Sequence, residues 1–118
     1  MADVSISEDT LVIELTIPER VVSLHGGSLT VPRRQITKAV AVPDAIAQVR
    51  GTRRPGAGVP GQLAIGIWSG DQAGRTFLDF VVVERPGPGV VLTLRGNEYD
   101  RIVLGTARPE HLIADLDR

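Results

Sequence analysis

Residues 62–105 read QLAIGIWSGDQAGRTFLDFVVVERPGPGVVLTLRGNEYDRIVLG, and this stretch decides the fold. It contains four apolar runs in which alternate residues share a face, as they do in a half-buried strand. Glycine, proline, asparagine and aspartate, the residues that favour turns, separate one run from the next. The runs cover Gln62–Trp68, Arg75–Glu84, Val90–Arg95 and Tyr99–Gly105. Evenly spaced short strands with turns between them predict an antiparallel meander, and hence a sandwich or a barrel.

Three further strands are predicted upstream of this stretch. They cover Thr10–Ile17, Ser28–Val31 and Gln35–Val42. Together with the four runs they give about seven strands, so the predicted fold class is mainly β. A C-terminal helix is predicted to start at Pro109 and Glu110, because proline suits a first helical turn and an acidic residue complements its positive end. Its apolar stripe consists of Leu112, Ile113 and Leu116.

The segments between these elements are less regular. Pro18–Gly26 has two interpretations: a capping box favours a short helix, whereas a second strand is the rival interpretation. Asp44–Arg50 is predicted to form one or two helical turns with its apolar residues inward. Gly51–Gly61 contains four glycines and two prolines in eleven residues and is expected to be a loop. The inward residues of the helical turns are Ala45, Ile46 and Val49.

Composition limits the classes of protein to which the chain can belong. Its 118 residues suit a single domain over 1–118, and with 3% aromatics its core must consist of valine, leucine and isoleucine. A net charge of −1 argues against nucleic-acid binding. The absence of cysteine excludes disulfides, thiolate nucleophiles and cysteine-ligated zinc. No signal peptide appears in Met1–Ser7 and no apolar run reaches the roughly 18 residues of a membrane span, so we expect a cytoplasmic protein.

Several short phrases point to a known group. They are Leu29-Thr30-Val31-Pro32 with Ile36, Gly51-Thr52-Arg53-Arg54-Pro55-Gly56, Val59-Pro60-Gly61, Gly66-Ile67-Trp68 and Tyr99-Asp100-Arg101-Ile102-Val103-Leu104. With them the chain resembles small bacterial pleckstrin-homology (PH)-like domain proteins, particularly actinobacterial ones. The resemblance implies a barrel of two near-orthogonal sheets with the C-terminal helix at one open end. It implies no functional residue, because such bacterial groups are mostly without an assigned activity.

The sequence contains no recognisable catalytic or metal-binding set. His25 and His111 have no partner at metal-ligand spacing, and Asp79 is expected to face solvent or to form a salt bridge with a basic neighbour. We therefore predict no enzyme, no catalytic residue, no metal and no cofactor. Trp68, the only tryptophan, is either a core residue or an exposed interface anchor.

Basic residues are the remaining candidate site. Guanidinium groups suit phosphate recognition, although a charge run is more often a solvated face. The candidate anion-binding residues are Arg33, Arg34, Lys38, Arg53 and Arg54. The leading hypothesis is a non-enzymatic interaction module that binds a protein segment or its own copies, through a sheet edge or the groove beside the C-terminal helix. The alternative is binding of an anionic ligand or a phospholipid headgroup through the arginines.

Overall fold

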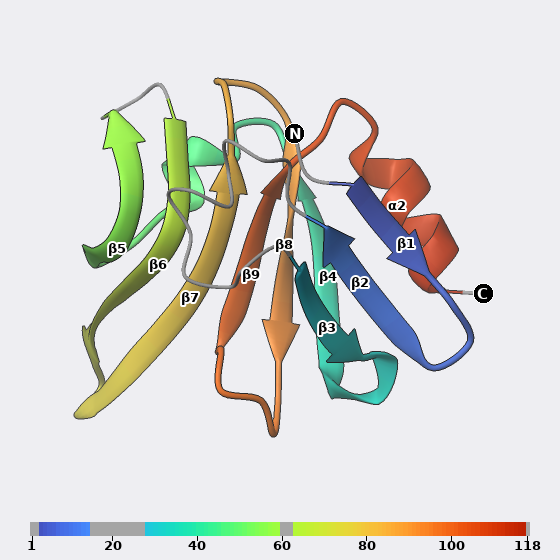
Figure 1. Cartoon of the computed structure of the whole chain (residues 1–118), viewed down its shortest axis with the longest axis horizontal. Coiled ribbons are helices and arrows are strands. Elements are labelled where there is room, and N and C mark those ends of the chain that lie inside the picture. The colour runs from blue at the N-terminus through green and yellow to red at the C-terminus, as the bar shows by residue number, and fades with distance from the viewer. Residues whose placement is uncertain (1–2, 15–27, 60–62, 118) are drawn as a thin grey trace.

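The computed structural model describes residues 3–14, 28–59 and 63–117; of Asp3 and of residues 53–59 it describes the backbone alone. These residues form two β-sheets and one α-helix (Figure 1). The elements are β1 (Asp3–Ile6), β2 (Thr10–Glu14), β3 (Ser28–Pro32), β4 (Ile36–Val42), β5 (Thr52–Val59), β6 (Leu63–Gln72), β7 (Arg75–Val83), β8 (Gly89–Leu94), β9 (Arg101–Gly105) and α2 (Pro109–Leu116). The mainly-β prediction with a C-terminal helix is confirmed.

The strands pair in an order that the sequence does not reveal. One sheet has the order β1-β2-β3, and the other has the order β4-β8-β9-β7-β6-β5. The predicted meander is wrong at β9, which lies between β7 and β8 and runs parallel to β7. Of the two predicted architectures, a sandwich is consistent with the structure and a closed barrel is wrong, because the described strands form two open sheets, with β4 and β5 at the edges of the larger one.

Asp100, the residue before β9, holds this inserted strand on both sides. Its backbone N–H donates to the Leu78 carbonyl at 2.7 Å, and its own carbonyl accepts from the Leu94 N–H at 2.9 Å. Its carboxylate accepts from the Leu78 N–H at 2.8 Å. The side chain thus completes backbone pairing that the turn before β9 would otherwise leave open.

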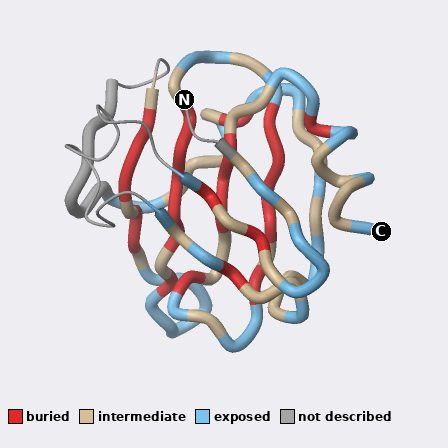
Figure 2. Tube along the Cα trace, turned by 45° about the vertical axis from the view of Figure 1, so that its right-hand side comes forward, coloured by how far each residue is buried: buried red, intermediate tan, exposed pale blue. Residues whose placement is uncertain are grey.

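Both faces of the larger sheet are buried, and β7 shows this most clearly. Phe80 and Val82 point to one face, which we call the first face, and Val81 and Val83 point to the other, the second face. Such continuous apolar runs are typical of strands that are covered on both sides. Figure 2 shows buried residues following the strands through the centre of the molecule.

Different elements cover the two faces. The small sheet and α2 cover the first face with Leu11, Ile13, Val31, Leu112, Ile113 and Leu116. Residues 43–50, which include the 3₁₀ turn Ile46–Gln48, cover the second face. Ala45 is fully buried there, and Ile46 and Val49 pack beside it, so the prediction that these three residues point inward is confirmed.

The prediction of a loop over Gly51–Gly61 is wrong for most of its length. Thr52–Val59 forms β5, an edge strand whose one partner within the described part of the chain is β6. The register shifts between Arg53 and Gly56, next to Pro55. A proline is tolerated in an edge strand or at a bulge because its missing N–H breaks no central ladder. The predictions for Pro18–Gly26 lie outside the described residues.

Gly89 and Gly105, which pair across β8 and β9, offer a matched test of the core. A Cβ at Gly89 would collide with the Leu104 carbonyl oxygen and lie 2.6 Å from the Ala45 Cβ, whereas at Gly105 the nearest atoms, of Val83, lie 3.5 Å away. We expect Gly89→Ala to lower the free energy of unfolding by about 2–3 kcal/mol and Gly105→Ala to change it by less than about 0.5 kcal/mol. Urea denaturation measures both. Equal losses would contradict this packing.

Tyr99, the only tyrosine, is almost fully buried and packs against Phe80 with ring centroids 5.5 Å apart. Burial, aided by the charge of Glu98, raises the pKa of its phenol well above the usual range. Below about pH 10 the folded and unfolded chains both keep the proton, and above it the unfolded chain loses the proton first. We therefore expect stability to fall above about pH 10, and to fall less in Tyr99→Phe. Tyrosinate absorbance near pH 10 from a chain that is still folded would contradict this.

Candidate functional site

The structure does not bring the five predicted anion-binding residues together. Arg33 and Arg34 lie in the 3₁₀ turn before β4, and Lys38 lies on β4 itself. Arg53 and Arg54 lie on β5, at the opposite edge of the same sheet. The set is therefore two separate groups of positions.

Arg33 joins three parts of the fold. Its guanidinium donates to the carbonyls of Ser7, at 3.0 Å, and Glu8 in the turn between β1 and β2, and to the carbonyl of Leu116 in the last turn of α2. A cation at this position pairs with helix carbonyls that lack an intrahelical partner. Arg33, which the sequence predicted to bind an anion, thus ties α2 to the small sheet.

A different cluster of charges forms around Asp79, at the centre of the larger sheet. Asp79 has no exposed surface. Arg50 donates to it twice, from Nε to Oδ2 at 2.7 Å and from Nη2 to Oδ1 at 3.0 Å. Arg101, its register neighbour on β9, donates from Nε to Oδ2 at 3.2 Å. The expected salt bridge of Asp79 is confirmed and the expected exposure to solvent is wrong, because residues 43–50 cover this face.

The arginine partners are themselves held in place. Arg50 lies over the Phe77 ring, 3.9 Å from its centroid, and donates from Nη1 to the Gln72 Oε1 at 2.6 Å. Arg101 donates from Nη2 to the Gln48 carbonyl at 2.6 Å. The hydrogen bond to Asp79 holds the pKa of Arg50 above its usual range, and burial opposes that shift. The cluster thus fastens residues 43–50, which we call the covering segment, to the larger sheet.

A hollow of about 380 Å³ opens beside this cluster on the second face. We call it the arginine hollow. Arg75 stands at its rim with its side chain 74% exposed and donates to the Asp100 Oδ1 at 2.8 Å. The polar lining of the arginine hollow consists of Arg50, Gln72, Arg75, Thr93, Asp100 and Arg101. Three arginines therefore line one solvent-accessible space.

A second hollow, of about 540 Å³, lies between β1 and α2. We call it the helix groove. Val4 and Ile6 of β1 and Leu112 of α2 supply its apolar surface, and Glu8 and Asp115 supply negative charge. Figure 1 shows β1 beside the helix, and the edge of β1 away from β2 has no strand partner among the described residues. The volume of the helix groove is within the range of ligand-binding pockets, roughly 300–1,000 Å³.

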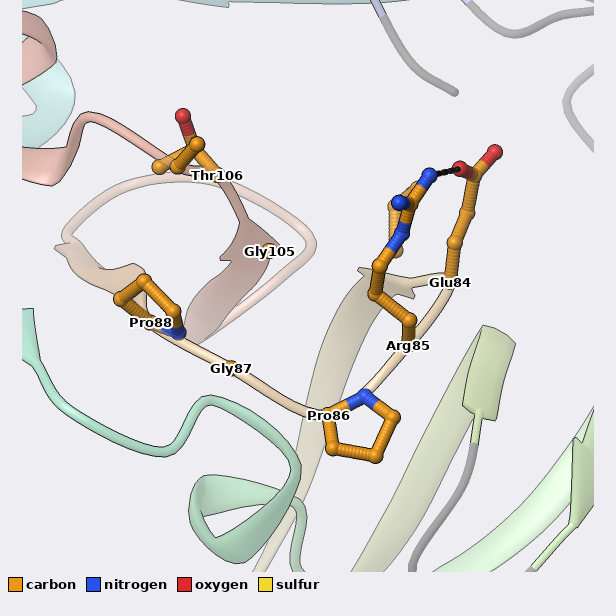
Figure 3. A pocket seen from close by; sticks show the side chains of 9 residues that line it. Glu84, Arg85, Pro86, Gly87, Pro88, Gly105 and Thr106 are labelled. Carbon is orange, nitrogen blue, oxygen red and sulfur yellow. Dashed lines mark ion pairs between the residues drawn. The ribbon is translucent and has the colours of Figure 1, made fainter.

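A third cavity, of about 130 Å³, lies under the loop between β7 and β8 (Figure 3). The lining includes Pro86 and Pro88, and Figure 3 shows the side chain of Arg85 beside that of Glu84, with Nη2 and Oε2 3.9 Å apart. The cavity is smaller than a typical ligand pocket and contains no acid–base pair at hydrogen-bond distance. We assign it no function.

The remaining candidate residues are the one tryptophan and the two histidines. Trp68 is 7% exposed and packs in the core of the second face, so the core interpretation is confirmed. His111 is exposed on α2, and His25 lies outside the described residues. Within residues 3–14, 28–59 and 63–117, no three His, Cys, Asp or Glu side chains gather at a metal-binding distance, and no helix is long and apolar enough to cross a membrane.

Removal of the central carboxylate tests the importance of the cluster. Asp79→Asn leaves two partly buried guanidinium groups without their anion, so we expect the free energy of unfolding to fall by about 3–5 kcal/mol. Asp44→Asn, at an exposed position, should change it by less than about 0.5 kcal/mol. Urea denaturation of both variants measures the difference. A loss below about 1 kcal/mol in Asp79→Asn would show that the pair behaves as an exposed one.

No family model, no curated protein and no solved structure matches this chain. The resemblance to bacterial PH-like domain proteins therefore stays a prediction.

Proposed function

We propose that this protein is a non-enzymatic, cytoplasmic interaction module that binds an extended segment of a partner protein in the helix groove. The observation that carries the proposal is the position of this groove, between an amphipathic helix and a strand edge that no described strand pairs with. A peptide strand can add to such an edge through its backbone, while alternate side chains enter the apolar surface beside it.

The charge of the groove defines the chemistry of the partner. Among the described residues, Glu8 and Asp115 line it with carboxylates. Arg33, the one cation among the described lining residues, already donates to three backbone carbonyls. The segment that fits has apolar residues at alternate positions and a lysine or arginine beside them, because opposite charges favour encounter and register.

The resemblance to PH-like domains belongs to the same proposal. Two sheets with a C-terminal helix over one face support it. The inserted β9 and the open edges of the larger sheet are departures from a plain PH barrel.

A phage-displayed library of random linear peptides, selected on the whole protein, tests the proposal. We expect enriched peptides with alternating apolar residues and at least one basic residue. Fluorescence anisotropy should show binding about tenfold weaker to Leu112→Glu than to Ala114→Glu, which adds the same charge at an exposed position of α2.

Because Leu112 also contacts the core, a rim variant gives an independent test. Glu8→Lys should weaken binding and reduce its dependence on salt, whereas Asp44→Lys, with the same change of charge elsewhere, should not. Peptides that bind all four variants equally would overturn the proposal. A dimer that Leu112→Glu dissociates would instead assign the groove to a second copy of the chain.

A further inference from the structure

The cluster around Asp79 carries an excess of positive charge. Arg50 and Arg101 share one carboxylate, so two cations face a single anion. The neighbouring pair of Arg75 and Asp100 is neutral and does not correct the excess. The side chains of Arg50 and Arg101 are only 29% and 19% exposed, so water compensates this charge less well than at an open surface.

The guanidinium groups also have donors to spare. Each Nη atom of an arginine carries two N–H bonds and Nε carries one. Arg101 donates from Nε to Asp79 and from one N–H of Nη2 to the Gln48 carbonyl. Its Nη1 has no partner among the described residues. Arg50 uses one N–H of each Nη atom. Arg75 spends one on Asp100.

The three arginines line one space. Arg50, Arg75 and Arg101 all line the arginine hollow, and so does Thr93, the register neighbour of Arg101 on β8. Lys38 pairs with Thr93 across β4 and β8, which places another cation at the next position of the same row. Donors therefore approach the hollow from the covering segment, the β6–β7 hairpin and the centre of the sheet.

We propose that the arginine hollow binds a phosphate group. A carboxylate offers two acceptor oxygens, and both oxygens of Asp79 already accept hydrogen bonds from Arg50 or Arg101. A phosphate offers at least three oxygens in a tetrahedral arrangement, which suits three guanidinium groups and a hydroxyl approaching from different sides. The site lies on the second face, whereas the helix groove lies beside the layer over the first face, so it is independent of peptide binding.

Titration of the whole protein with inorganic phosphate, followed through the arginine Nε–H signals in NMR, tests the proposal. At constant ionic strength we expect saturable shifts at Arg101, Arg50 and Arg75, with a dissociation constant at or below about 1 mM. Sodium chloride alone should not produce them. Shifts that do not saturate, or that chloride reproduces, would overturn the proposal.

A matched pair of variants tests the location without removing the central salt bridge. Arg75 and Arg85 are both 74% exposed and each pairs with one carboxylate, but only Arg75 lines the hollow. Arg75→Gln should weaken phosphate binding about tenfold, and Arg85→Gln should leave it unchanged. Thr93→Val, which adds no charge, should weaken it by a smaller factor. Equal affinities in all variants would overturn the proposal.

Vesicles of phosphatidylcholine with phosphatidic acid identify the source of the phosphate. Co-sedimentation that inorganic phosphate displaces and that Arg75→Gln weakens would assign the hollow to a lipid phosphomonoester. Saturable phosphate binding without co-sedimentation would assign it to a soluble ligand. Co-sedimentation that phosphate does not displace, together with a flat titration, would overturn the site.

Discussion

The carboxylate of Asp79 lies in the middle of an apolar strand and needs a positively charged partner. The ion pairs that it forms hold the second face of the larger sheet together. Arg101, the register neighbour of Asp79, supplies one guanidinium group and the covering segment supplies Arg50. Breaking such a buried pair costs far more than breaking an exposed one, because the remaining charge stays buried. The cluster thus links the inserted strand β9, the central strand β7 and residues 43–50 in a single interaction.

The two candidate sites differ in the charge of their lining residues. On the second face, two cations share one anion, and the excess charge with its spare donors makes the arginine hollow suitable for a phosphate. The helix groove has the opposite character, with an apolar surface and acidic residues, and Arg33 holds α2 beside the turn that follows β1. The chain therefore has two hollows of different chemistry, one lined by arginines and one lined by apolar and acidic residues.

Local pattern predicted most elements but not their neighbours. Alternation found the strands that became β2 to β4 and β6 to β9, and Pro109 with Glu110 marked the helix start. Composition misled at β5, because an edge strand tolerates proline. The place of β9 depends on Asp100 contacts with strands on both sides, which no local pattern contains. The pair of Asp79 and Arg50 spans 29 residues, so the sequence left open whether Asp79 faces solvent or a basic neighbour, and which neighbour that is.

The coupling free energy between Arg50 and Asp79 tests the central claim most directly. A double-mutant cycle of Arg50→Met and Asp79→Asn, with each variant unfolded in urea, isolates that quantity from the effects of the single changes. If Asp79 fastens the covering segment to the sheet, the coupling should exceed about 2 kcal/mol. A coupling below about 0.5 kcal/mol, the value of an exposed ion pair, would contradict the claim.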